Sequence, residues 1–358
     1  MNTYIIRSGL QHTKAALERG TLTIGYLGGS ITEGRTKRNW SRYFNGWICS
    51  EYPQVKIVSE NAAMGATNSI LGCLRAEKRI LERQCDLVFV EYAVNDNDLD
   101  KELRFEAREG LLRKLLNEGN CDVVLVYTYC WDMKSSIDKN EMPETIADFE
   151  KLAEHYGISS VWPGLEAYRG WQKGLYAYKE WLPDGLHPEC FGSNIYMKCV
   201  KKFFTEALDS RKEKKLYPNP LYEKNWENAY LFPIDNLKVT GSGMFYRSYH
   251  FIPIDPVFIT QAAGTTLSFE FEGTGCLVTS MVDKDSFGYR YKVDDGELVE
   301  VQHTKSTWMD EAGGHFYVQT VAHHLEYGTH RVEITSIPSN AKAGTGSVLE
   351  IPFIGILV

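Results

Sequence analysis

The first 210 residues alternate between short apolar segments and longer amphipathic segments. The apolar segments are rich in β-branched and aromatic residues, which predicts strands at 21–27, 55–58, 86–92 and 122–129, with a shorter one at 158–161. Apolar residues at helical spacing predict helices at 8–19, 39–52, 67–83, 103–116, 145–156 and 190–208. Because the strands are almost wholly apolar, we expect a parallel sheet covered by helices on both faces, an α/β/α arrangement.

The pattern changes beyond residue 210. Residues 211–229 hold prolines and many charges, which favours a linker. Strand-like segments then follow at 267–273, 276–282, 289–295, 330–336 and 347–358, separated by turn signals. We therefore predict a parallel-sheet domain over 1–212, a linker over 213–229 and an all-β sandwich, jelly-roll-like, over 230–358.

Composition and charge exclude several classes of protein. The net charge is −8 and no basic stripe is present, so nucleic acid is not an expected partner. No apolar run approaches the roughly 20 residues needed to span a bilayer, and the N-terminus lacks a signal-like apolar core, so we expect a cytoplasmic protein with no membrane association. The 8 cysteines are scattered without a CxxC pair, which is typical of buried thiols in a reducing compartment.

Four short segments follow predicted strands or precede the last predicted helix. They are Gly29-Ser30, 61–69, 93–98 and 184–188. Each one alone has an ordinary interpretation as a turn, a helix entry or a cap. Because the carboxyl ends of parallel strands share one edge of a sheet, we expect the four segments to converge there.

Together these segments hold the groups that acyl transfer requires. Ser30 becomes nucleophilic only if a base removes its proton, and His187 is the candidate base. Asp184 lies three residues before His187 and can orient its ring. An oxyanion needs fixed donors, which the backbone N–H groups of Ser30 and Gly65 and the side-chain amide of Asn95 can supply.

The same residues resemble the SGNH, or GDSL-like, hydrolase family. The family's four blocks carry Ser, Gly, Asn and His, matching positions 30, 65, 95 and 187, and its Asp-x-x-His pair matches Asp184 and His187. The resemblance covers about 20–208 and implies a flavodoxin-like three-layer fold, a serine esterase mechanism and no metal or other cofactor. The sequence departs from the family pattern in two places. Gly29 precedes the serine where the family name indicates Asp, and Ala93 stands where block three usually has Gly.

We therefore expect a serine esterase that hydrolyses small acyl esters, chiefly acetyl, on a carbohydrate. Its partner would be a small-molecule or oligosaccharide ester. One alternative is a lysophospholipase or thioesterase on the same fold, and another is a glycan-binding protein whose hydrolase domain is inert. The ordinary α/β-hydrolase elbow needs Gly-x-Ser-x-Gly, but Thr32 occupies the last position here.

Several further residues have two interpretations. Trp131 and Trp181 either line a sugar or acyl site or belong to the core. Asp96 is expected to brace its loop rather than react. His323 and His324 lack the carboxylate or cysteine spacing of a metal site and are interpreted as strand-end residues. We expect the β domain to brace the catalytic domain, with glycan binding as the alternative.

Overall fold

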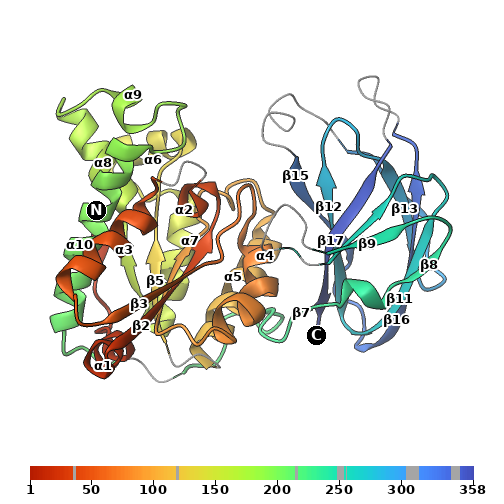
Figure 1. Ribbon diagram of the computed structural model, residues 1–358, viewed down its shortest axis with the longest axis horizontal. Helices are drawn as coiled ribbons and strands as arrows, with labels where there is room; N and C mark the ends of the chain where they lie inside the picture. The colour runs from red at the N-terminus through yellow and green to blue at the C-terminus, as the bar shows by residue number, and fades with distance from the viewer. Residues whose placement is uncertain are drawn as a thin grey trace. The chain divides into compact units, whose positions relative to one another are not determined.

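The computed structural model of the chain describes residues 1–34, 38–117, 121–213, 217–247, 254, 256–303, 314–339 and 347–358. These residues form two compact units, Met1–Glu227 and Asn228–Val358 (Figure 1). The first unit mixes helices and strands, and the second unit is built almost entirely from strands. Both fold classes predicted from the hydrophobic pattern are confirmed.

The first unit is centred on a six-stranded sheet. In spatial order its strands are β1 (Tyr4–Ile5), β6 (Ser159–Val161), β5 (Asp122–Val126), β4 (Leu87–Glu91), β2 (Thr21–Gly28) and β3 (Lys56–Asn61). Strands β2 to β6 are parallel, and β1 is antiparallel to β6. The parallel strands follow the flavodoxin-like order, in which the chain reverses direction across the sheet beside β2. Strands β4 and β5 are buried at every residue, as their apolar sequences require.

Helices form two groups around this sheet. One group is α1 (Gln11–Arg19), α3 (Trp40–Glu51), α8 (Pro163–Gln172), α9 (Tyr178–Trp181) and α10 (Cys190–Asp209), in which α10 packs against each of the others. The other group is α4 (Ser69–Ala76), α5 (Lys101–Asn117) and α7 (Glu144–Tyr156), in which α5 packs against α4 and α7. The sheet runs between the two groups in Figure 1, which gives the three layers.

Some elements differ from those predicted. The segment 67–83 is not one helix, because α4 is followed by a π-helical turn at Glu77–Leu81. The helices α2 (Ser30–Glu33), α6 (Lys134–Asp138), α8 and α9 were not predicted, nor was the 3-10 turn at Trp131–Met133. Three of them, α2, α6 and α9, have only four or five residues, too few turns to show a periodic pattern, and tertiary packing rather than propensity forms them.

The end of the segment predicted as a linker packs onto the first unit. Trp226 is buried, and its backbone N–H donates to the carbonyl of Glu106 at 3.2 Å. A β-carbon at Gly110 of α5 would lie 2.5 Å from the Trp226 backbone, so the absence of a side chain there allows this close approach. The first unit therefore extends to Glu227.

The second unit is a sandwich of two antiparallel sheets. One sheet has the order β15 (His315–Ala322), β12 (Gly275–Val282), β17 (Leu349–Leu357), β10 (Val257–Thr260) and β9 (Met244–Tyr246), with β7 (Tyr230–Leu231) also pairing with β17. The other has the order β14 (Val299–Val301), β13 (Gly288–Val293), β16 (Gly328–Ile337), β11 (Thr266–Gly273) and β8 (Lys238–Thr240). Alternate residues of β11, Leu267, Phe269 and Phe271, point into the shared core.

Candidate active site

Ser30 lies where β2 turns into a four-residue helix. Gly28 ends β2, Gly29 is the extended residue that precedes the helix, and Ser30 is the first residue of α2. This position is at the carboxyl end of a central strand, where open α/β sheets bind ligands. The sequence prediction for the location of Ser30 is therefore confirmed.

Ser30 and His187 are hydrogen-bonded, although 157 residues separate them. The Ser30 Oγ lies 2.7 Å from His187 Nε2. On the other side of the ring, His187 Nδ1 lies 2.6 Å from Asp184 Oδ2. The three side chains thus form one hydrogen-bonded series in the order hydroxyl, imidazole, carboxylate, which is the arrangement that activates a serine.

Asp184 is held by the backbone of its own turn. Its Oδ1 accepts hydrogen bonds from the N–H groups of Leu186 at 2.8 Å and His187 at 2.7 Å. Burial by itself raises the pKa of the Asp184 carboxyl, but the hydrogen bonds from His187 and Leu186 outweigh it and lower the pKa below its ordinary value. Asp184 is therefore ionised at neutral pH, as an acceptor for the imidazole N–H must be.

Two helices fix the turn that carries Asp184 and His187. Tyr178 of α9 donates its hydroxyl to the carbonyl of Gly185 at 2.9 Å. Ser193 of α10 donates to the carbonyl of Pro188 at 2.9 Å. Gly185 has φ +95°, a left-handed conformation in which glycine avoids the strain of other residues. The turn is thus anchored on both sides of His187.

The predicted oxyanion donors occupy loops beside Ser30. Gly65 lies in the turn between β3 and α4, and this loop is tied to β2 because Met64 N–H donates to the Gly28 carbonyl at 2.9 Å. Asn95 follows β4, and its side-chain amide lies against Gly29. Strands β3 and β4 flank β2 in the sheet, so both loops reach the edge where Ser30 lies. The oxyanion role of Ser30, Gly65 and Asn95 stays a prediction.

Asp96 braces its loop, as the sequence analysis expected. It is buried and accepts hydrogen bonds from Ser69 N–H at 2.8 Å and from Arg108 Nε at 2.6 Å. Arg108 is also fully buried and lies over the ring of Phe149. This ion pair joins the loop after β4 to α4 and α5, so Asp96 is not free to act on a substrate.

The two tryptophans proposed for substrate binding have different environments. Trp181 has 0% exposure and packs against Tyr129, with ring centroids 4.8 Å apart. Its prediction as a substrate-binding residue is wrong, because a side chain enclosed in the core cannot reach a ligand. Trp131 is 54% exposed and packs edge-on against Tyr178, the residue that supports the His187 turn. It stays a candidate for substrate contact.

A small cavity opens at the hydrogen-bonded series. Its volume is about 180 Å³, and Ser30, Ile31, Pro183, His187 and Glu189 are among its lining residues. This volume is below the roughly 300–1,000 Å³ typical of sites for drug-sized ligands. The cavity suits a small group bound to Ser30.

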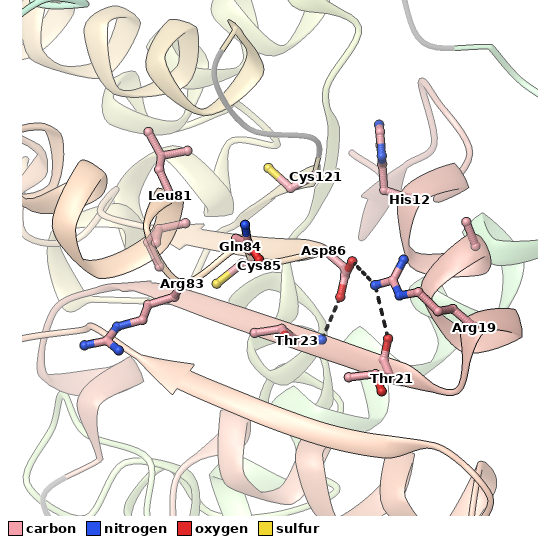
Figure 2. Close-up of a pocket in the computed structure, with 12 residues that line it drawn as sticks. His12, Arg19, Thr21, Thr23, Leu81, Arg83, Gln84, Cys85, Asp86 and Cys121 are labelled. Atoms are coloured by element: carbon pink, nitrogen blue, oxygen red, sulfur yellow. Dashed lines mark hydrogen bonds and ion pairs between the residues drawn. The ribbon is translucent and has the colours of Figure 1, made fainter.

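A larger cavity, of about 650 Å³, lies elsewhere in the first unit (Figure 2). Its lining includes Arg19, Thr23, Cys85, Asp86 and Cys121, which lie in, or within two residues before, the amino ends of β2, β4 and β5. Figure 2 shows Asp86 accepting from both Arg19, at 2.8 Å, and the Thr23 N–H, at 2.8 Å. The cavity therefore lies at the opposite edge of the sheet from Ser30, and its lining carboxylate, Asp86, is engaged with Arg19 and Thr23.

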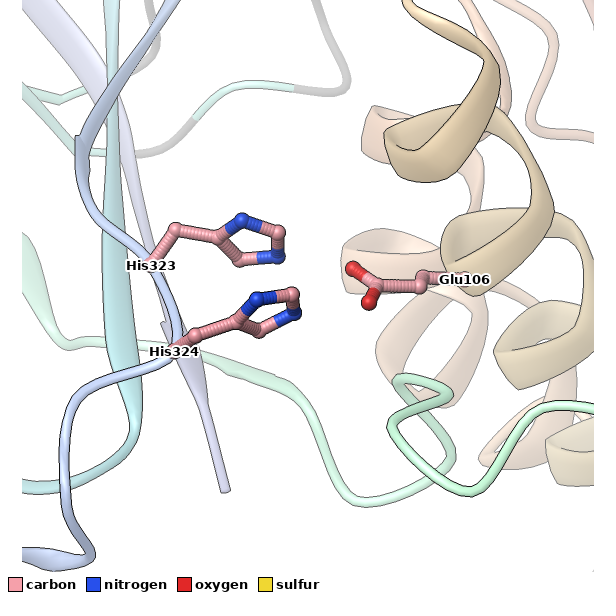
Figure 3. A group of neighbouring side chains, drawn as sticks. All are labelled: Glu106, His323 and His324. Carbon is pink, nitrogen blue, oxygen red and sulfur yellow. The ribbon is translucent and has the colours of Figure 1, made fainter.

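The two neighbouring histidines of the second unit directly follow β15, as the sequence analysis interpreted them (Figure 3). The rings of His323 and His324 stack, with centroids 3.7 Å apart.

None of the helices in the described parts of the chain has the length and apolar character needed to cross a membrane.

Comparison with known proteins identifies the fold. No protein-family model and no curated protein sequence matches this chain. Among solved structures, a two-domain esterase active on acetylated mannans has a TM-score of 0.84 and 21% identity, covering 98% of this chain and 96% of its own. The same description applies to a structure co-crystallised with mannopentaose, at a TM-score of 0.83 and 22% identity, covering 98% of this chain and 95% of that one. An acetylxylan esterase from Geobacillus stearothermophilus covers 55% of this chain and 97% of its own, at 17% identity and a TM-score of 0.41.

These likenesses define the class of fold to which the chain belongs. It is an α/β/α unit with a flavodoxin-like parallel sheet, followed by a β-sandwich unit. In this architecture, the chain resembles the mannan-active two-domain esterase along nearly its whole length.

Proposed function

We propose that this protein is a serine esterase that removes acetyl groups from a carbohydrate. The observation that carries the proposal is the hydrogen-bonded series in which Ser30 Oγ lies 2.7 Å from His187 Nε2 and His187 Nδ1 lies 2.6 Å from Asp184 Oδ2. Distances of this size allow proton transfer from the hydroxyl to the imidazole without a rearrangement.

The reaction follows from these positions. His187 Nε2 takes the proton as Ser30 Oγ attacks the ester carbonyl, and Asp184 stabilises the imidazolium. The backbone N–H groups of Ser30 and Gly65 and the amide of Asn95 stabilise the oxyanion. His187 then protonates the leaving alcohol, which leaves an acyl group on Ser30. Water, deprotonated by His187, attacks this acyl-enzyme, and His187 returns the proton to Ser30 Oγ as the carboxylic acid leaves.

Two observations favour a small acyl group on a sugar. The cavity at Ser30 is about 180 Å³, which suits an acetyl group better than a fatty chain. The chain also resembles, over 98% of its length, an esterase active on acetylated mannans. We therefore propose an acetylated oligosaccharide, with mannan fragments as the first substrates to test. The second unit is proposed to brace the catalytic unit.

The decisive test replaces the nucleophile. Ser30→Ala should abolish hydrolysis of p-nitrophenyl acetate and acetylated mannooligosaccharides, because no other group on the turn can form the acyl-enzyme. Ser50→Ala is the matched control, since Ser50 lies on the exposed face of α3 and bonds only the Gly46 carbonyl at 3.0 Å. Undiminished activity in Ser30→Ala would overturn the mechanism.

Acyl-chain length and active-site labelling separate the alternatives. Faster hydrolysis of octanoate than of acetate esters would favour a lysophospholipase or thioesterase. Oligosaccharide binding without ester cleavage, together with no labelling of Ser30 by a fluorophosphonate, would favour an inert glycan-binding protein. The proposed esterase should label at Ser30 and prefer acetate.

A further inference from the structure

A buried carboxyl group lies directly beneath the turn that carries Ser30. Glu91 is the last residue of β4, pairs in register with Gly28 of β2, and has 0% exposure. The sequence alone assigns Glu91 no role, because it stands next to the end of the segment 86–92 outside any recognisable motif. A carboxyl group enclosed in this way opposes folding unless hydrogen bonds compensate its loss of water.

Both oxygens of Glu91 accept hydrogen bonds from buried threonines. Thr32 Oγ1 donates to Oε2 at 2.9 Å, and Thr128 Oγ1 donates to Oε1 at 2.8 Å. Trp40 Nε1 in turn donates to Thr32 Oγ1 at 3.1 Å. The three donor side chains have 0% exposure, so the network excludes water. Such fully satisfied buried networks hold their members in one arrangement.

This network matters for Ser30 because α2 cannot hold its own shape. The helix has four residues, Ser30–Glu33, far fewer than an isolated helix needs to be stable. Thr32, two residues after Ser30, is the residue of α2 that bonds to this network. The Thr32 side chain is held by Glu91, and the Thr32 carbonyl accepts from Asn39 Nδ2 at 2.5 Å and Asn61 Nδ2 at 3.2 Å.

We propose that Glu91 is a positioning residue of the esterase: by accepting hydrogen bonds from Thr32 and Thr128, it fixes the turn that places the Ser30 hydroxyl against His187. The inference rests on the proposed function, since it concerns the reactivity of Ser30. Glu91 does not contact the reacting atoms. Its contribution is geometric, and displacement of a reacting group by about 1 Å can reduce the rate roughly 100-fold.

The charge of Glu91 gives this role a pH signature. Burial raises the pKa of Glu91 to about 7; hydrogen bonds from Thr128, Thr32 and the Gly29 N–H oppose the rise, and the nearby Asp96 adds to it. The other titratable groups facing it are Tyr92, which directly follows β4, and Tyr196 of α10, while Asp96 is itself paired with Arg108 of α5. When Glu91 is ionised, both of its oxygens are strong acceptors for the threonine hydroxyls. When Glu91 is protonated, one oxygen carries the proton and is a weaker acceptor.

The test measures kcat and KM for p-nitrophenyl acetate and the rate of fluorophosphonate labelling of Ser30. Glu91→Gln keeps the shape of the side chain and removes its charge. We expect kcat and the labelling rate to fall roughly 10- to 100-fold with KM within about 2-fold of wild type. The ratio of wild-type to variant kcat should be larger at pH 8.5 than at pH 5.5, where the wild-type carboxyl is also neutral.

A matched control separates positioning from stability. Glu109 is an equally buried carboxylate of the same unit, on α5, and accepts from the N–H groups of Leu221 and Tyr222 at 2.7 Å each. Glu109→Gln should leave kcat unchanged, and the melting temperatures of both variants report any change in stability separately from the kinetics. Equal kcat losses in the two variants would overturn the inference.

Thr32, which donates a hydrogen bond to Glu91, provides an independent check. Thr32→Val removes the hydroxyl at constant volume and should repeat the loss seen in Glu91→Gln, whereas Thr32→Ser keeps the hydroxyl and should retain activity. The loss of kcat in the double variant Glu91→Gln/Thr32→Val should be smaller than the product of the two single losses, because both substitutions disturb the contact between Glu91 and Thr32. Additive losses would contradict the proposal.

The labelling experiment also separates the two proposals. If Ser30 of the wild type is not labelled and the wild type hydrolyses no ester, the proposed function itself fails. If the wild type is labelled and Glu91→Gln is labelled equally fast, only the role of Glu91 is overturned.

Discussion

The side-chain amide of Asn95 occupies the space that a side chain at Gly29 would need. A β-carbon at position 29 would lie 2.1 Å from Asn95 Oδ1 and 2.9 Å from its Nδ2. The sequence of the nucleophile turn and that of the loop after β4 therefore depend on each other. With the Asn95 side chain in this position, only glycine fits at position 29.

Gly29→Ala should damage the site without straining the backbone. Gly29 has φ −89°, which alanine adopts readily, so the effect comes from the collision with Asn95. If Asn95 is displaced as an oxyanion donor, we expect kcat for p-nitrophenyl acetate to fall roughly 100- to 1,000-fold. Steady-state kinetics on the purified variant measure this directly.

Gly46→Ala is the matched control for that substitution. Gly46 lies inside α3, and a β-carbon there meets no atom within 4 Å. Alanine should stabilise the helix by roughly 0.5–1 kcal/mol and leave kcat unchanged. Similar kinetics in Gly29→Ala and Gly46→Ala would show that the contact with Asn95 is not needed for activity.

Asp184→Asn should leave the turn in place but remove the acceptor that orients His187. An amide can direct its NH₂ group at Nδ1 and favour the wrong imidazole tautomer, so we expect kcat to fall by about 10⁴ near pH 7. The measurement is kcat for acetate esters, with circular dichroism to verify the fold. Asp294→Asn is the control, because Asp294 makes the same kind of contact with His330 Nδ1, at 2.8 Å, in the second unit. A comparable loss in both variants would contradict the assignment.

Trp131→Ala should distinguish substrates that differ in the sugar. Because Trp131 is 54% exposed beside the helix that supports His187, we expect it to stack on the carbohydrate and not on the acetyl group. Loss of about 0.5–1.5 kcal/mol of aromatic contact predicts a KM increase of roughly 2- to 12-fold for an acetylated oligosaccharide. KM for p-nitrophenyl acetate should not change. The control is Leu175→Ala, at a 71% exposed residue, and an equal effect on both substrates would remove Trp131 from the site.

Glu91 should make the stability of the first unit depend on pH. Burial raises its pKa from 4.5 to about 7, so the folded protein holds this proton more tightly than the unfolded chain does. The free energy of unfolding should therefore fall as pH rises from about 4.5 to about 7, by at most roughly 3 kcal/mol from this group. Glu91→Gln cannot ionise at this position, so it removes this pH dependence of the free energy of unfolding.

Denaturant unfolding at pH 5 and pH 8 measures the difference. Seven of the 8 tryptophans, all except Trp308, lie within Met1–Glu227, so their fluorescence reports mainly on the first unit. Between pH 5 and pH 8, the free energy of unfolding of wild type should fall relative to that of Glu91→Gln. A constant gap would mean that Glu91 has the same charge at both.

The fold and the site differ in how far local sequence specifies them. Buried strands such as β4 and β5 are continuous apolar runs, so their positions follow from the sequence. The short helix α9 has no periodic pattern, and Trp181 at its end could equally have lined the site or the core. Its enclosure beside Tyr129 results from packing between residues 52 positions apart in the sequence.

The sequence by itself determined the alternation of strands and helices, the change to β structure, and the four segments that bear Ser30, Gly65, Asn95 and His187, because period and spacing are local properties of the chain. The 2.7 Å distance between Ser30 and His187, and the burial of Glu91 beneath the turn that carries Ser30, come only from the folded structure. Such contacts join residues distant in sequence, and they exist only once the sheet has brought its strand ends together.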